Sequence, residues 1–136
     1  MLRAKISMIS VLFLGLFFFC SNMLWGEDWK RYGTNESGEF YYDAESITRP
    51  AKNKVRVWAK MVHSKKNIKK LGKDLEDLVY SKRLWEINCA DKKIRRLSKV
   101  AYSKSGKILI SDNKEEKWQG ISPKSLTGKL YEKVCK

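Results

Sequence analysis

Cysteine and histidine are the scarcest side chains in this sequence that could carry out covalent or metal chemistry. There are three cysteines, Cys20, Cys89 and Cys135, and one histidine, His63. Cys89 and Cys135 are too far apart for a CxxC redox motif, and one histidine cannot complete a tetrahedral zinc site with them. No serine or cysteine nucleophile is evident beside His63, so we expect a solvated side chain there. The sequence therefore predicts no metal and no cofactor.

A short polar segment contains Tyr42, Asp43, Glu45 and Ser46 and could bind a ligand. We favour a turn in which Asp43 or Ser46 bonds to nearby backbone, and we expect no catalytic residue there. Trp58 could stack on a sugar ring, but we favour packing against a helix that covers its face of a sheet. We therefore do not expect an enzyme.

The basic residues are concentrated in two runs, which form the candidate partner surface. They are Lys65, Lys66, Lys69, Lys70 and Lys73 in the first run, and Lys92, Lys93, Arg95, Arg96 and Lys99 in the second. Charge runs are often only solvated faces, although arginines can make forked contacts with sulfate or phosphate. We expect acidic glycans, lipopolysaccharide or acidic host proteins as partners.

The first 26 residues differ from the rest of the chain and are typical of a secretory signal peptide. Arg3 and Lys5 form its basic start, residues 11–20 (VLFLGLFFFC) are apolar, and the small residue Gly26 precedes Glu27. We predict cleavage between Gly26 and Glu27. The mature protein would then be one domain, residues 27–136, in the periplasm or on the outer surface of a bacterium.

Two alternatives to cleavage stay open. Leu24 is large for a position where signal peptidases prefer small residues, so the segment could stay as an N-terminal anchor. Cys20 could instead carry a lipid, although phenylalanines precede it where such signals have small residues.

Export also determines what we expect of the other two cysteines. Removal of the signal takes Cys20 away and leaves Cys89 and Cys135 in an oxidising compartment. We predict a structural disulfide between them, with a free pair or an intermolecular bridge as the alternatives.

The composition is that of one small, basic, folded domain. The chain has 136 residues, 43% of them hydrophobic and 32% charged, and its five Trp, six Tyr and five Phe can supply a core. The signal contains two of the 29 basic residues and none of the 15 acidic ones, so the mature net charge is +12. Such a charge attracts polyanions with a salt-dependent affinity, and export argues against nucleic acid as the physiological partner.

Alternating apolar residues predict antiparallel strands along most of the domain. The clearest is 54–62 (KVRVWAKMV), and 84–89 (LWEINC) places Cys89 beside two large apolar groups. Tyr41 and Tyr42 follow a turn signal that could open another strand, and residues 49–53 are typical of a loop.

The segment 92–102 (KKIRRLSKVAY) is also a predicted strand, but it breaks the alternation. Ile94, Val100 and Tyr102 share one parity, whereas Leu97 has the other, which indicates a bulge. A tight turn at 104–106 then leads into a strand at 107–111 and completes a hairpin.

Two segments have helical spacing. Ser122 is a predicted N-cap before Pro123, and an apolar stripe of Leu126, Leu130 and Val134 follows and ends beside the last cysteine. The second candidate, residues 67–80, contains a glycine that disfavours a helix, so it could begin only near residue 74. The predicted fold is α+β: a small antiparallel β-sheet with a C-terminal helix and a candidate second helix packed on it, and one disulfide.

A series of short segments runs through the domain in a characteristic order. They are WKRYG at 29–33, YYDAESI at 41–47, VRVW at 55–58, LWEINC at 84–89, GKIL at 106–109, WQGISP at 118–123 and VC at 134–135. In this order the chain resembles the bacterial surface-adhesin protein E-like family. The resemblance implies export and a small antiparallel sheet with helical packing, and the family is named for members that adhere to host matrix and serum glycoproteins.

Three classes of function follow from these observations. We rank first an exported, non-enzymatic binding protein of the bacterial envelope, an adhesin for acidic host or glycan partners. The alternative is a periplasmic structural or assembly protein without a host ligand, such as a homodimer joined through an uncovered edge strand. A small hydrolase has no support beyond scattered carboxylates.

Overall fold

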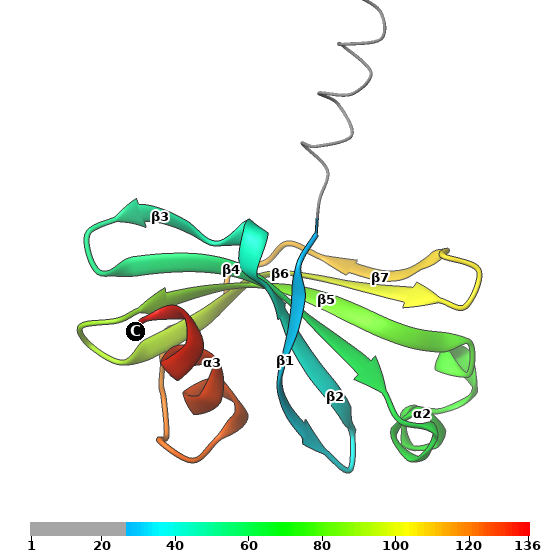
Figure 1. The fold of residues 1–136 in the computed structure, drawn as a ribbon. Coiled ribbons are helices and arrows are strands. Elements are labelled where there is room, and N and C mark those ends of the chain that lie inside the picture. The colour runs from blue at the N-terminus through cyan, green and yellow to red at the C-terminus, as the bar shows by residue number, and fades with distance from the viewer. Residues whose placement is uncertain (1–26) are drawn as a thin grey trace, which may run out of the picture.

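A computed structural model describes residues 27–136 of the chain. The predicted signal peptide, residues 1–26, lies outside the described residues. The strands are β1 (Trp29–Asn35), β2 (Gly38–Asp43), β3 (Thr48–Ala51), β4 (Lys54–His63), β5 (Leu78–Asn88), β6 (Lys93–Ser103), β7 (Ile108–Asp112) and β8 (Gln119–Gly120). The helices are α2 (Lys65–Leu71) and α3 (Leu126–Val134), with 3₁₀ turns η1 (Ala44–Ser46) and η2 (Lys73–Leu75) (Figure 1).

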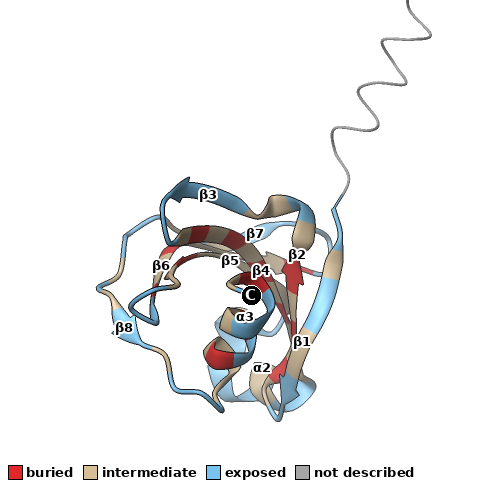
Figure 2. Ribbon diagram, turned by 60° about the vertical axis from the view of Figure 1, so that its left-hand side comes forward, coloured by how far each residue is buried: buried red, intermediate tan, exposed pale blue. Residues whose placement is uncertain are grey.

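The strands form a single antiparallel sheet in the order β1-β2-β4-β5-β6-β7, with β3 added to β4 and β8 added to β6. The sheet is curved, and α3 lies in its concave face (Figure 2). Helix α2 lies toward the opposite end of the sheet (Figure 1). This architecture confirms the predicted α+β fold with a C-terminal helix. Within residues 27–136 no helix combines the length and the apolarity that a membrane crossing requires.

The core forms where α3 packs on the concave face of the sheet. Val55 and Val57 of β4 and Ile87 of β5 are fully buried, and they pack with Leu130 and Val134 of α3. The predicted alternation of residues 54–62 is therefore confirmed, because every second side chain from Val55 to Met61 is buried on this face of β4. The apolar stripe predicted for the last helix is the side that it buries.

The bulge predicted in the strand around Leu97 is also present. Leu84 pairs with Ser98 and Trp85 pairs with Arg96, so Leu97 is the additional residue on β6. An extra residue exchanges the two faces of a strand from that point onward. Val100 and Tyr102 therefore lie on the outer face, opposite to Ile94, although the three residues share one parity in the sequence.

The helix predicted over residues 67–80 is shorter and begins earlier. It spans Lys65–Leu71, and Gly72 follows with φ 96°, a left-handed conformation that ends the helix. After η2, residues 78–80 already belong to β5, where Tyr80 pairs with Tyr102. Sheet pairing decided these last residues, because their apolar spacing suits a strand as well as a helix.

Two boundaries also differ from the sequence prediction. Residues 49–51, expected in a loop, belong to β3, whose ladder to β4 is irregular and whose side chains are all exposed. Ser125, not Ser122, caps α3: its Oγ accepts a hydrogen bond from the Gly128 amide at 3.0 Å. The segment around Pro123 is a turn that precedes the helix.

The predicted disulfide is confirmed: Cys89 and Cys135 are bonded, with their Cα atoms 5.6 Å apart. Cys135 directly follows α3, and Cys89 directly follows β5. The Tyr131 hydroxyl also donates a hydrogen bond to the carbonyl oxygen of Cys89 at 3.0 Å. The bond therefore fastens the last helix to a central strand at the edge of the core.

Candidate binding surfaces

The first basic run forms helix α2 and the turn after it. The helix begins because the Ser64 hydroxyl accepts a hydrogen bond from the Asn67 amide at 3.1 Å, which makes Ser64 its N-cap. An open hollow with a volume of about 470 Å³ lies along one side of the helix. We call it the α2 hollow, and it is lined by Lys65, Ile68, Lys69, Gly72, Lys73 and Glu76.

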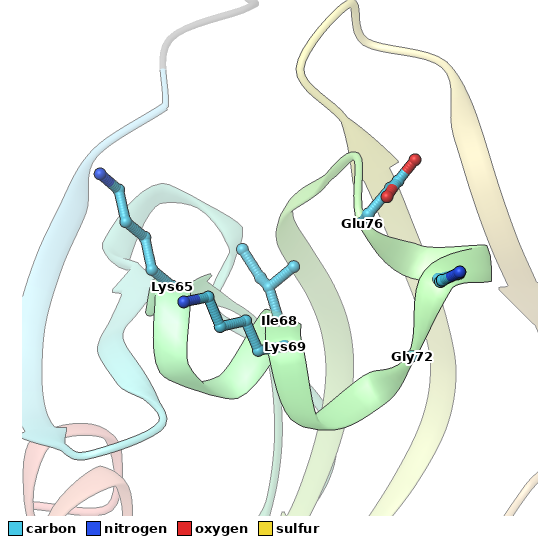
Figure 3. Close-up of a pocket in the computed structure, with 6 residues that line it drawn as sticks. Lys65, Ile68, Lys69, Gly72 and Glu76 are labelled. Atoms are coloured by element: carbon cyan, nitrogen blue, oxygen red, sulfur yellow. The ribbon is translucent and has the colours of Figure 1, made fainter.

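Figure 3 shows how these side chains lie: Lys65 and Lys69 extend along one side of the α2 hollow, and Ile68 points into it. Lys66 binds the Glu36 carboxylate, with 3.4 Å between Nζ and Oε2. Among residues 27–136, the other four lysines of this run form no ion pair, and all are exposed. These four are Lys65, Lys69, Lys70 and Lys73. Their positive charge is therefore free to attract an acidic partner.

The second basic run is divided among three places. Lys92 and Lys93 are exposed at the turn before β6 and its first residue. Arg95 lies on the outer face of the sheet, whereas Arg96 and Lys99 lie on the concave face, because the bulge follows Arg96. The structure therefore does not bring the five residues of this run together on one surface.

Arg95 takes part in a buried charge cluster. Glu86 is only 1% exposed, and its carboxylate accepts hydrogen bonds from Arg56 Nε at 2.7 Å and from Arg95 Nη2 at 2.7 Å. Burial alone would raise the pKa of Glu86, but the hydrogen bonds from the two arginines outweigh it and lower that pKa. Arg95 also stacks on Trp118, with its Cζ 4.5 Å from the ring centroid. Arg95 on β6 therefore connects Glu86 of β5 to Trp118.

Arg96 is likewise bound within the protein. Its Nη2 lies 2.8 Å from a Glu116 carboxylate oxygen and 3.3 Å from an Asp112 oxygen. Its Nε is buried and has no hydrogen-bond partner among the described residues. The forked contacts with sulfate or phosphate expected of Arg95 and Arg96 would have to displace these internal ion pairs.

The sequence prediction missed a group of aromatic side chains on the outer face of the sheet. We call it the outer aromatic patch, and it consists of Trp29, Tyr41, Trp58, Tyr80 and Tyr102, which come from five strands. Within residues 27–136 neither α2 nor α3 packs over Trp58, contrary to our expectation, because α3 occupies the opposite face. The sequence pattern does not reveal the patch, because Tyr102 reaches this face only through the bulge in β6.

Two lysines lie among these rings. Lys60 Nζ is 4.5 Å from the centroid of Trp29 and 5.6 Å from that of Tyr41, and Lys82 Nζ is 5.5 Å from Trp29. The hydrogen bond from the Trp29 indole, helped by the charge of Lys82, lowers the pKa of Glu27. The rings of the patch are half-buried, and the cation–π contacts of the two lysines already engage several of them.

The polar segment after β2 is a turn, as predicted. Asp43 Oδ1 accepts hydrogen bonds from the amides of Glu45 at 3.0 Å and Asp28 at 2.9 Å. The Ser46 hydroxyl donates to the Asp43 carbonyl at 2.7 Å and accepts from the Trp58 amide at 3.0 Å. These side chains satisfy backbone groups and join η1 to β4.

His63 is not the solvated residue that we expected. It is half-buried, and its ring nitrogens contact Ser81 Oγ at 3.0 Å and Asn67 Nδ2 at 2.8 Å. Burial, together with the charges of Arg83 and Lys99, lowers its pKa to about 4. Over residues 27–136 no group of three His, Cys, Asp or Glu side chains is placed to hold a metal ion.

The fold is similar to that of Haemophilus influenzae protein E. One crystal form of that protein matches with a TM-score of 0.59 and 16% sequence identity, over 79% of this chain and 86% of that one. A second structure of it gives a TM-score of 0.58 at 16% identity, over 79% and 83%. Protein E from non-typeable H. influenzae gives 0.56 at 14% identity, over 79% and 74%. No curated protein matches this sequence.

A likeness at such low identity shows a shared fold, and the family assignment comes from the sequence itself. The sequence profile described as surface-adhesin protein E matches residues 29–136, which is all but two residues of the described chain. The disulfide and the antiparallel sheet implied by the sequence are both present. The chain belongs to the surface-adhesin protein E family.

Proposed function

We propose that the protein is an exported, non-enzymatic binding protein of the bacterial envelope, an adhesin that holds acidic partners. Its family is one of surface adhesins, and its mature domain has a net charge of +12 if residues 1–26 are removed. The partner class is acidic glycans, lipopolysaccharide or host matrix glycoproteins. The observation that carries the proposal is the set of α2 lysines that form no ion pair in the described part of the chain.

The α2 hollow is the part of the surface best suited to such a partner. Lys65 and Lys69 are one helical turn apart and Lys73 follows after the end of the helix, so their charges lie along one side of the molecule. Exposed charges are screened beyond about 8 Å at physiological salt, so binding should weaken steeply as ionic strength rises. Lys92 and Lys93 add a second, separate group of exposed positive charges at the turn between β5 and β6.

Binding to immobilised heparin, measured against salt concentration, tests the charge proposal. The variant is Lys65→Glu, Lys69→Glu and Lys73→Glu together. The matched control is Lys52→Glu, Lys117→Glu and Lys124→Glu, which changes the net charge equally at exposed positions elsewhere. We expect the α2 variant to lose at least about tenfold more affinity than the control, since it removes local contacts as well as net charge. Equal losses would mean that only diffuse charge attracts the polyanion.

Exposure at the cell surface needs a separate test, because an adhesin must be reachable from outside. Protease added to intact cells should degrade the protein, while a periplasmic marker protein stays whole. Protection equal to that of the marker would reject the adhesin proposal and favour the periplasmic structural role.

One observation favours that second role. Strand β7 lies at an edge of the sheet, and Ile108 on it is 56% exposed. Uncovered edge strands can pair with another copy of a chain. A mass that rises with concentration, measured by analytical ultracentrifugation and abolished by Ile108→Lys, would support an assembly role.

A further inference from the structure

A second cavity lies on the concave face, at the end of the sheet near α2. It has a volume of about 230 Å³. We call it the concave pocket. Asn67 and Leu71 of α2 line it, whereas Lys65 and Lys69 line the α2 hollow, so the two cavities are on different sides of the helix.

The concave pocket combines charged and apolar groups. Strands β4, β5 and β6 contribute the polar side chains of His63, Ser81, Arg83 and Lys99, and also apolar ones. The segment of α2 and η2 and strand β7 contribute Leu71, Leu75 and Ile110 beside the polar Asn67. A mainly apolar pocket with two cations suits a ligand that has an ionic group and a hydrocarbon part.

The two cations in the pocket face each other directly. Arg83 on β5 is paired with Lys99 on β6, and both side chains point into the concave face. Like charges placed directly opposite each other in a sheet are destabilising. Burial, together with each cation's positive neighbours, lowers the pKa of both Arg83 and Lys99. The fold therefore keeps two positive charges together at a cost in stability.

The protein itself neutralises this pair only in part. Among residues 27–136 neither cation forms an ion pair, and the Arg83 guanidinium donates to Met61 Sδ at 3.9 Å. Asp112, which pairs with Lys99 across β6 and β7, and Glu116 partly offset the positive charge. Both carboxylates, however, form their ion pairs with Arg96.

Ser81 holds the ring of His63 at the same wall. The Asn67 side-chain amide donates to His63 Nδ1, so the proton of the neutral imidazole is on Nε2 and is donated to Ser81 Oγ. Ser81 is completely buried, so its hydroxyl orients His63 and leaves the two cations as the groups that a ligand can reach.

We propose that the concave pocket binds a small amphiphilic anion. Its carboxylate, sulfate or phosphate group lies between Arg83 and Lys99. Its short hydrocarbon part packs on Leu71, Leu75 and Ile110. The cavity is smaller than the 300 Å³ or so typical of sites for drug-sized molecules, so the hydrocarbon part has only a few carbons. This site is separate from the polyanion surface proposed above.

Calorimetry and thermal unfolding of the 27–136 protein test this proposal with defined probes. Hexanoate, hexyl sulfate and hexyl phosphate supply the anionic group with a hydrocarbon chain, acetate and inorganic phosphate supply the group alone, and hexanol supplies the chain alone. We expect the hexyl anions to bind and to raise the melting temperature, and each of the other probes to bind at least about tenfold more weakly. The order among the three hexyl anions identifies the preferred head group. Hexanol binding as tightly as hexanoate, or no binding by any probe, would overturn the proposal.

Variants identify the site. Lys99→Met removes one cation and keeps an apolar stem of similar length, and Lys104→Met is the matched control on an exposed turn. We expect Lys99→Met to lose hexanoate binding by about tenfold or more, since a charge-assisted contact is gone, and Lys104→Met to bind normally. Without ligand, Lys99→Met should melt no lower than the unchanged protein, because the like-charge pair is relieved. Equal affinities of the two variants for hexanoate would contradict the proposal.

The unchanged protein provides a readout that needs no variant. A bound anion would offset the charges of Arg83 and Lys99, which help to lower the pKa of His63 to about 4. The titration of His63 followed by NMR should therefore shift to higher pH when hexyl sulfate is added, since a sulfate ester stays ionised at pH 4, and inorganic sulfate should shift it less. An unchanged titration at saturating hexyl sulfate would place any binding elsewhere and overturn the assignment.

Discussion

Cys135, the residue that follows α3, is covalently bonded to Cys89, the residue that follows β5. The bond closes the chain over the core that Leu130 and Val134 form with the sheet. It joins the last helix to a strand laid down much earlier in the sequence. A chain cross-linked in this way has fewer unfolded conformations, which raises the free energy of unfolding.

Removal of the disulfide should destabilise the domain. We expect Cys89→Ser together with Cys135→Ser to lower the free energy of unfolding by roughly 2 to 5 kcal/mol. Urea denaturation of both proteins measures the difference. Reductant serves as the control, since it should destabilise the unchanged protein and leave the variant unaffected. A variant as stable as the unchanged protein would show that the packing of α3 alone holds the helix in place.

The buried carboxylate of Glu86 should matter far more than an exposed one. We expect Glu86→Gln to lower the free energy of unfolding by about 2 kcal/mol, because it weakens charge-assisted hydrogen bonds to Arg56 and Arg95. The matched control is Glu132→Gln, whose carboxylate pairs with Lys136 at 2.7 Å on the surface. That change should cost no more than about 0.5 kcal/mol. Similar losses in the two variants would contradict a special role for Glu86.

Stability should depend on pH through His63. Its pKa falls from the ordinary 6.5 to about 4 on folding, so between these values the unfolded chain binds a proton that the folded one does not. The free energy of unfolding is therefore not reduced by His63 above pH 6.5, and it decreases as the pH falls from 6.5 toward 4. Glu86, whose pKa is also lowered on folding, adds a further loss only below about 4.5.

Urea denaturation at several pH values between 4.5 and 7 measures this effect. His63→Gln should flatten the pH dependence across that range, because glutamine does not titrate. An equally steep loss of stability in the variant would assign the effect to other groups.

Glycine at position 128 should resist substitution although it lies in a helix. Alanine usually favours a helix over glycine by about 1 kcal/mol. Here a Cβ would collide with the carbonyl oxygens of Ser122 and Pro123, so we expect Gly128→Ala to destabilise the protein. Gly120→Ala, where a Cβ meets open space, is the control and should melt close to the unchanged protein. A stabilised Gly128→Ala would mean that the turn before α3 moves freely.

Processing gives a prediction about the N-terminus. Mass spectrometry of the protein from cells that express the full sequence should find a chain that begins at Glu27. A chain that begins at Met1 would indicate an uncleaved anchor, and lipid on Cys20 would indicate a lipoprotein signal.

Some features followed from local sequence alone. The alternation of residues 54–62 specified β4 because one face of that strand is buried and the other is not. The break at Leu97 specified a bulge, and the four-residue spacing of Leu126, Leu130 and Val134 specified α3. The two cysteines outside the predicted signal peptide specified the disulfide. Each of these signals lies within one segment of the sequence, except the disulfide, which followed from the number of cysteines.

Only the tertiary structure decided which side chains meet across strands. Arg83 and Lys99 face each other, and the lysines of the outer face lie among the rings of Trp29 and Tyr41, because of sheet register. Register depends on how several strands pair at once, and one extra residue in β6 moves every later side chain to the other face. The basic runs are a property of the sequence, but the division of the second run between two faces of the sheet is a property of the fold.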